Sequence, residues 1–167
     1  RSSNLSSDEA AYYLPAIERI RGHWPAIDLV NDSLSATAPG YAYGLATVSL
    51  LTGSDRLTLR LVNLVVSAGV LCSGWWILRR SGIAPPWFLL PLGLCNFFVK
   101  SAGFVVTDNA ALLAIALTLG ATLFAGGRPG GVVAAGCATL AVAGRQNSVW
   151  LLVPLAGKIL GRIRAGG

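Results

Sequence analysis

The 167-residue chain is 54% hydrophobic and 12% charged, with a mean hydropathy of +0.64. Because a soluble domain typically carries about 25% charged residues, this composition argues against a soluble fold and indicates a membrane protein. The net charge of +6 then favours basic residues that fix orientation in a bilayer over a nucleic-acid partner. Since the chain begins at Arg1 and contains no Met, we expect it to be a piece of a longer protein.

The first segment, residues 1–59, contains most of the acidic residues and is predicted to be an extracytoplasmic loop with interfacial, amphipathic helices. Tyr13, Ile17 and Ile20 are spaced to share one face of a helix. Pro15 should kink or restart that helix, because proline lacks the backbone N–H. The apolar run 45–51 is too short to cross a bilayer and is predicted to be an interfacial or partly buried helix.

The second segment, residues 60–167, is predicted to contain transmembrane helices at about 61–79, 87–106, 109–127, 131–144 and 148–160. The first of these runs is uncharged between Arg60 and Arg79-Arg80. We therefore expect an all-α fold, a polytopic transmembrane helix bundle, of which this chain is an incomplete part.

Basic residues follow alternate predicted spans: Arg79-Arg80, Arg128, and Lys158 with Arg162 and Arg164. The positive-inside tendency places these boundaries in the cytoplasm. Residues 1–59, the turn 107–109 and the segment 145–147 then all face the other side. The sequence thus predicts that three distant polar segments meet on one membrane face.

Each acidic candidate has a functional and a structural interpretation. Asp8-Glu9 could supply a general base for a hydroxyl nucleophile, but Ser6 with Glu9 also fits a helix capping box. Asp108 could act at the same face, but Thr107 or Asp108 could equally cap a helix that begins at Asn109.

The basic candidates have the same two interpretations. Arg145, with the amides of Gln146 and Asn147, could hold a phosphate, or it could mark a helix boundary at the interface. Arg60 could bind a ligand, or it could anchor the end of its helix.

Metal and nucleotide sites have little support in the sequence. His23 is the sole histidine, and the cysteines lack the close spacing of a zinc site. No phosphate-binding glycine loop of the GxxxxGK type occurs. We predict no cofactor, and the requirement for a metal stays open.

The order of four motifs resembles that of the GT-C superfamily of membrane glycosyltransferases: Asp8-Glu9, Ala38-Pro39-Gly40-Tyr41, Leu59-Arg60-Leu61-Val62-Asn63 and Thr107-Asp108-Asn109. Within that superfamily the chain most resembles the α-1,2-glucosyltransferases that use dolichyl-phosphate-glucose, because a fifth motif, Gly144-Arg145-Gln146-Asn147-Ser148-Val149-Trp150, is similar to their Arg-Gln motif. It departs from their pattern at the Arg-Gln motif, which lacks a Thr, and at Val106, where the family has an aromatic residue.

The resemblance implies transfer of a glucose-like hexose from a polyprenyl-phosphate donor to a hydroxyl, with inversion, on the extracytoplasmic face. The acceptor would be a lipid-linked glycan or another hydroxyl compound. It implies catalytic roles for Asp8, Glu9 and Asp108, and donor-phosphate binding by Arg145, Gln146, Asn147 and Arg60. The 11 Arg against 2 Lys favour a bacterial cytoplasmic membrane as the location. A fragment of a membrane transporter or flippase is the alternative, since it too places charges at membrane depth.

Overall fold

A computed structural model describes residues 9–26, 28, 39–144, 148 and 151–165 of the chain, and in these residues the regular structure is helical. The elements in chain order are η1 (Glu9–Tyr13), α1 (Leu14–Gly22), α3 (Pro39–Thr52), α4 (Arg56–Ser81), η2 (Pro86–Leu89), α5 (Leu90–Leu94), α6 (Asn96–Gly103), α7 (Asp108–Phe124), α8 (Gly127–Gly144) and α9 (Leu152–Ala165). The expectation of an all-α fold is therefore confirmed for the described residues.

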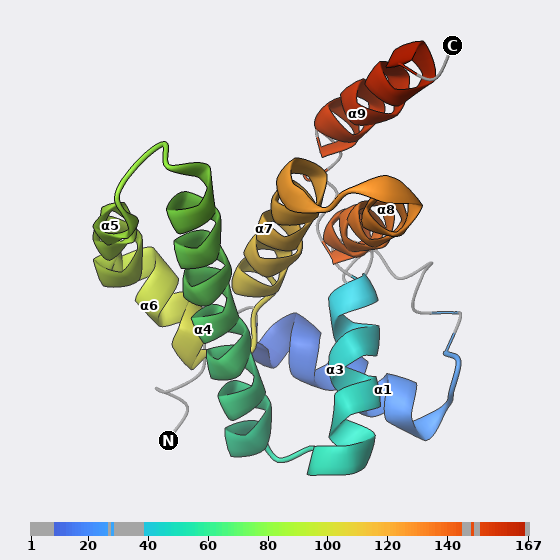
Figure 1. The fold of residues 1–167 in the computed structure, drawn as a ribbon. Coiled ribbons are helices and arrows are strands. Elements are labelled where there is room, and N and C mark those ends of the chain that lie inside the picture. The colour runs from blue at the N-terminus through green and yellow to red at the C-terminus, as the bar shows by residue number, and fades with distance from the viewer. Residues whose placement is uncertain (1–8, 27, 29–38, 145–147, 149–150, 166–167) are drawn as a thin grey trace.

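The longest helix, α4, organises the arrangement (Figure 1). On one side it carries η2, α5 and α6, and on the other it packs against α7, which in turn packs against α8. Helices α1 and α3 lie against each other near the end of α4 at which that helix begins. Helix α9 extends away from the other helices at the C-terminal end.

Helix α4 has defined signals at both ends. The Asp55 carboxylate accepts hydrogen bonds from the Thr58 backbone amide at 2.9 Å and from the Thr58 hydroxyl at 2.6 Å. At the other end Gly82 adopts the left-handed conformation, with φ of 66°, and its amide donates to the Leu78 carbonyl at 3.2 Å. These caps extend the helix beyond the uncharged run that predicted it.

The Asp55 cap gives a pH-dependent prediction. The bonds from the Thr58 hydroxyl and then the Thr58 amide lower the pKa of the Asp55 carboxyl below its usual value. A lowered folded-state pKa contributes stability above the unfolded pKa, and this stability is lost as the pH falls through the folded value. We expect amide-exchange protection at Thr58 to fall in acid, and to be lost at neutral pH in Asp55→Ala. An unchanged protection factor in Asp55→Ala would contradict the cap.

The first segment folds largely as its pattern predicts. Ile17 and Ile20 are buried and Tyr13 is half-buried, so all three share the inward face. Pro15 lies in the first turn of α1, directly after the π-helical turn η1, which agrees with a restart at proline. The helix predicted over residues 45–51 is longer than expected, because α3 already begins at Pro39.

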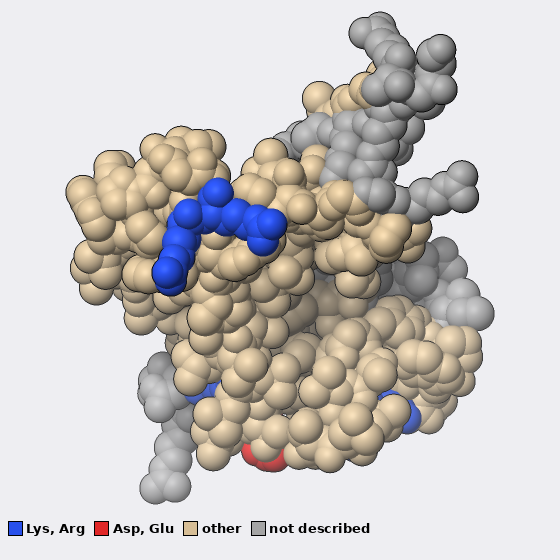
Figure 2. Space-filling view, in the orientation of Figure 1, with Lys and Arg blue, Asp and Glu red and all other residues tan. Residues whose placement is uncertain are grey.

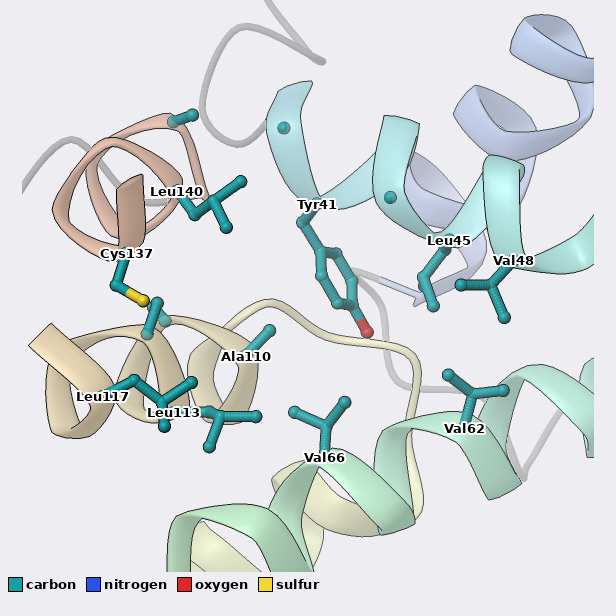
Figure 3. Close-up of a pocket in the computed structure, with 15 residues that line it drawn as sticks. Tyr41, Leu45, Val48, Val62, Val66, Ala110, Leu113, Leu117, Cys137 and Leu140 are labelled. Atoms are coloured by element: carbon teal, nitrogen blue, oxygen red, sulfur yellow. The ribbon is translucent and has the colours of Figure 1, made fainter. Parts of the chain in front are cut away.

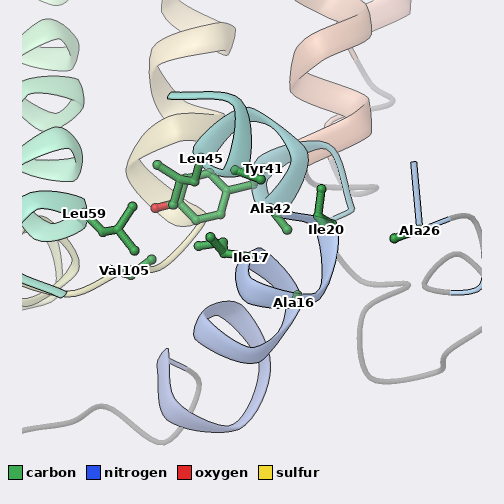
Figure 4. Close-up of a cluster of buried hydrophobic side chains, with 10 residues drawn as sticks. Ala16, Ile17, Ile20, Ala26, Tyr41, Ala42, Leu45, Leu59 and Val105 are labelled. Carbon is green, nitrogen blue, oxygen red and sulfur yellow. The ribbon is translucent and has the colours of Figure 1, made fainter. Parts of the chain in front are cut away.

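A buried cluster joins this first segment to the second (Figure 4). Ile17 and Ile20 from α1 meet Leu45 from α3, together with Leu59 of α4 and Val105. Val105 lies between α6 and α7, so the cluster brings the junction of these two helices against α1 and α3. Residues from both predicted parts of the chain therefore share one core.

The prediction of a single helix over 87–106 is wrong. This stretch forms η2, α5 and α6. A further break follows α6, and there the chain bends by 108° between α6 and α7. Pro91 lies at the start of α5, and Cys95 then adopts an extended conformation with φ of −63° and ψ of 124°. An apolar run alone therefore did not ensure a continuous helix.

One helix of the described residues, α4, is long and apolar enough to cross a membrane. The bent pair α6–α7 would make a second crossing if it counts as one broken span, and α8 contributes a shorter apolar helix over Pro129–Ala143. Figure 2 shows basic side chains near the C-terminal end of α4 and a broad uncharged surface beside them. Large apolar side chains on α4 face outward, among them Leu61, Leu64 and Val65.

Candidate functional site

The described residues include only part of the predicted site. Asp8, Arg145, Gln146 and Asn147 lie outside them, and Glu9 is described as the first residue of η1. Arg60 and Asp108 are fully described. The site can therefore be built from these two residues and from the residues that adjoin the other motifs.

Arg60 contacts the junction between α6 and α7. Its guanidinium carbon lies 4.9 Å from the centre of the Phe104 ring, and both residues are half-buried. A guanidinium over an aromatic face is a cation–π contact. The structure thus gives Arg60 a partner in the junction, and its predicted role towards a donor phosphate stays a prediction.

Asp108 is the first residue of α7 and is half-buried. Thr107 stands at the N-cap position, but it makes no side-chain cap hydrogen bond, so this part of the structural interpretation is wrong. The Thr107 carbonyl accepts the first helical bond, from the Ala111 amide at 2.9 Å. A carboxylate at the start of a helix is favoured by the helix dipole.

Asn63 holds the junction from the side of α4. Its buried amide nitrogen donates to the carbonyl oxygens of Ser101 and Phe104, both at 2.6 Å. Ser101 lies in the last turn of α6, where carbonyls lack a helical partner, so the Asn63 side chain takes the place of the missing turn. The Asn63 oxygen in turn accepts a bond from the Tyr41 hydroxyl at 3.2 Å, which ties α3 to the same point.

Asn109 of α7 makes a second buried link to α4, at Ser67, one helical turn after Asn63. Its amide nitrogen donates to the Ser67 hydroxyl oxygen at 2.8 Å and to the Phe98 carbonyl at 3.3 Å. Ser67 donates to the Asn63 carbonyl at 2.8 Å, so the two asparagines belong to one network. The Asn109 side-chain oxygen is buried and has no hydrogen-bond partner among the described residues, so the network is satisfied through the amide nitrogens. The network fixes the start of α7, where Asp108 lies, beside the break.

Residues that belong to the predicted motifs or adjoin them come together around Tyr41. The Tyr41 ring packs edge-on against Tyr13, with ring centres 5.5 Å apart, and Tyr13 shares η1 with Glu9. Next to Tyr41, Gly40 lies so close to α8 that a Cβ there would be 2.9 Å from the Ala143 Cβ. Ala143 precedes Arg145 by two positions in the sequence. The start of α3 therefore contacts η1, α4 and the end of α8.

An apolar pocket of about 310 Å³ opens between α3, α4, α7 and α8 (Figure 3). Tyr41, Val62, Leu113, Leu140 and Ala143 are among the residues that line it. Tyr41 belongs both to this lining and to the polar network at Asn63. The pocket thus has apolar walls and, at Tyr41, a link to the polar residues of the junction.

Sequence reasoning missed the pocket and the partners of the two asparagines. Small residues on the faces of apolar helices, such as Gly44, Ala110 and Ala114, are the signal that could have indicated a groove, and all three line the pocket. No group of three or more His, Cys, Asp or Glu residues that could hold a metal ion occurs within the described ranges.

Comparison with known proteins adds no further assignment. No model of a known protein family, no curated protein and no solved structure matches the chain significantly.

Proposed function

We propose that this chain is part of a multi-pass membrane glycosyltransferase that moves a hexose from a polyprenyl phosphate to an acceptor hydroxyl on the extracytoplasmic face. The observation that carries the proposal is the apolar pocket between α3, α4, α7 and α8. Its lining includes Tyr41, which belongs to the second motif, and Ala143, which directly precedes the fifth. A pocket of this kind suits an apolar lipid chain whose polar end must reach a separate polar site.

In the proposed reaction, Arg145 with Gln146 and Asn147 holds the phosphate of the donor. The bond between the anomeric carbon and the phosphate oxygen breaks, and the phosphate monoester leaves with the bonding electrons. A guanidinium that stays charged at all relevant pH values stabilises that developing charge. Arg60 contributes a further positive charge near the junction.

Asp8 accepts the proton of the acceptor hydroxyl as that oxygen bonds to the anomeric carbon from the opposite side, which inverts the configuration. Glu9 and Asp108 orient the acceptor or the chain around it. The position of Asp108 at the start of α7, beside a junction held by Asn63 and Asn109, supports a fixed orientation. Because cationic side chains hold the leaving phosphate, a metal is not obligatory in this proposal.

The proposed topology has five crossings, with the basic boundaries in the cytoplasm of a bacterial cell. In this proposal α4 supplies the first crossing, the broken segment from η2 to α6 the second and α7 the third, so the bent pair α6–α7 is divided between two crossings. Non-helical backbone at membrane depth is tolerated where protein buries it. The bonds from Asn63 and Asn109 to carbonyl oxygens of Ser101, Phe104 and Phe98 meet this requirement at the junction.

The test uses Asp8→Asn and Arg145→Ala in the full-length protein, in membranes supplied with a radiolabelled polyprenyl-phosphate hexose. We expect each substitution to lower the transfer rate by about 100-fold or more, since a general base and a charge-stabilising donor each contribute factors of this size. Asp28→Asn and Arg56→Ala serve as matched controls, because both residues are exposed and lie outside the proposed site. Near-normal transfer by both site variants would refute the assignment of roles.

A transporter is the second candidate, and the 108° bend between α6 and α7 favours it, since broken helices are typical of transporter binding sites. The same assay separates the two functions. A glycosyltransferase yields the labelled sugar covalently attached to an acceptor, whereas a transporter moves its substrate across the vesicle wall unchanged.

A further inference from the structure

A second apolar groove lies between the C-terminal half of α4 and the segment formed by η2 and α5. Its volume is about 410 Å³, and its lining is apolar and aromatic, with Leu71, Trp75, Trp87, Leu90 and Leu94 among the contributing residues. It shares no lining residue with the pocket beside Tyr41. The groove is therefore separate from the proposed catalytic site.

The groove is closed on one side by direct helix packing. A Cβ at Gly74 would lie 3.0 Å from the Leu89 side chain, so Leu89 approaches α4 closely at this glycine. The outer wall stays open: Trp75 is 50%, Trp87 61% and Leu94 79% exposed. Two exposed tryptophans beside an open apolar groove are typical of the border between the acyl chains and headgroups of a bilayer.

A positive charge adjoins this groove. Leu71, Trp75 and Arg79 follow one another at intervals of four residues, so they form one row along α4. The first two line the groove, and the third continues the row towards the end of the helix. Helical side chains lean towards the N-terminus, so the Arg79 side chain can reach back over the turn of Trp75.

The neighbouring Arg80 contacts aromatic rings instead. The Arg80 guanidinium carbon lies 5.7 Å from the Trp76 ring centre and 5.4 Å from that of Phe124, so Arg80 fastens α4 to α7. Arg79 is exposed, and among the described residues its side chain has no ion-pair or ring partner. The basic side chains near this end of α4 are visible in Figure 2.

We propose that this groove binds an anionic phospholipid, with one acyl chain against Trp75 and Trp87 and the lipid phosphate on the guanidinium of Arg79. The charge of Arg79 selects an anionic headgroup, and a guanidinium offers forked donors to phosphate oxygens. The proposal rests on the membrane placement of α4 in the proposed function. By the positive-inside tendency, the lipid belongs to the cytoplasmic leaflet.

The test is tryptophan quenching in the full-length protein, reconstituted into vesicles that contain brominated phosphatidylglycerol or brominated phosphatidylcholine. We expect half-maximal quenching at a mole fraction of the anionic lipid at least about threefold lower than that of the zwitterionic lipid. Arg79→Ala should bring the two mole fractions together. Arg80→Ala also removes one positive charge, but from a side chain that contacts α7, and it should leave the preference for the anionic lipid in place.

A second pair of variants tests the groove itself. Gly93 lines it, and a Cβ at this position would make only ordinary contacts with Leu71, at 3.8 and 3.9 Å. Gly93→Ala should therefore keep the lipid preference, whereas Gly93→Leu fills the groove and should reduce quenching by the anionic lipid.

The outcomes distinguish this proposal from the proposed function. Equal quenching by both lipids in the unmodified protein, or a preference that survives Arg79→Ala, overturns the lipid site and leaves the glycosyltransferase proposal intact. No quenching by either lipid overturns the membrane placement on which both proposals depend.

Discussion

Gly40→Ala is expected to destabilise the fold by about 1–3 kcal/mol, because the start of α3 has no room for a side chain. The added Cβ would lie 2.9 Å from both the Cβ and the carbonyl oxygen of Ala143, and 3.0 Å from its carbonyl carbon. Two of these three atoms belong to the backbone, which cannot rotate away. Relief therefore requires α3 and α8 to separate. Thermal unfolding of the purified protein in detergent measures the effect.

Gly44→Ala is the matched control for this experiment. Gly44 lies one turn further along α3, and a Cβ there would have no heavy atom within 4 Å. Since alanine favours a helix over glycine by about 0.5–1 kcal/mol, this variant should be as stable as the unmodified protein or slightly more stable. Equal melting temperatures for the two variants would show that α3 and α8 do not pack as described.

Asn63→Leu is expected to cost about 2–4 kcal/mol, because it removes every bond made by one buried side chain at similar volume. The carbonyl oxygens of Ser101 and Phe104 lose their donor, and the Tyr41 hydroxyl loses its acceptor. Each buried group that loses its partner costs its full desolvation free energy, so the junction between α6 and α7 should loosen. Faster amide exchange over residues 104–107 should accompany the drop in global stability.

Asn96→Leu provides the comparison at an exposed asparagine of α6. Since this side chain is exposed and lies at the opposite end of α6 from the junction, the substitution should be mild and should leave amide exchange over residues 104–107 unchanged. If Asn63→Leu were equally mild, the network through Asn63 would not hold the junction.

Local patterns in the sequence were sufficient for many of the helices. The spacing of Tyr13, Ile17 and Ile20 predicted the inward face of α1, and the uncharged run after Arg60 predicted α4. Both signals act within a few turns of one helix. The prediction of one helix over 87–106 failed where the backbone turns extended, at Cys95 and again at Phe104. Hydropathy averages over a window and does not detect a change of backbone conformation at one residue.

The packing between segments could not be predicted in the same way. Asn63 belongs to a predicted motif, but its bonds reach Ser101 and Phe104, which lie 38 and 41 residues further along the chain. The contact of Gly40 with Ala143 spans the greater part of the described chain. Such pairings depend on how whole helices cross, which periodicity in one helix does not specify. The pocket between four helices arises from these crossings.

In the candidate site, too, the residues could be predicted from the sequence but their contacts could not. The motif order predicted the site residues, and the structure brings residues in or beside several motifs together around Tyr41. The roles of Asp8, Glu9, Asp108 and Arg145 stay predictions that the transfer assay must test.

The most direct test of the account is the side of the membrane on which the early and late motifs lie. Single cysteines at Ser7 and Asn147 would be introduced after replacement of Cys72, Cys95 and Cys137 by alanine, with Ser81→Cys as the reference at the C-terminal end of α4. In intact cells, a membrane-impermeant maleimide should label positions 7 and 147 from outside and should not reach position 81. Labelling of 7 and 147 from opposite sides would contradict a shared site and with it the proposed glycosyl transfer.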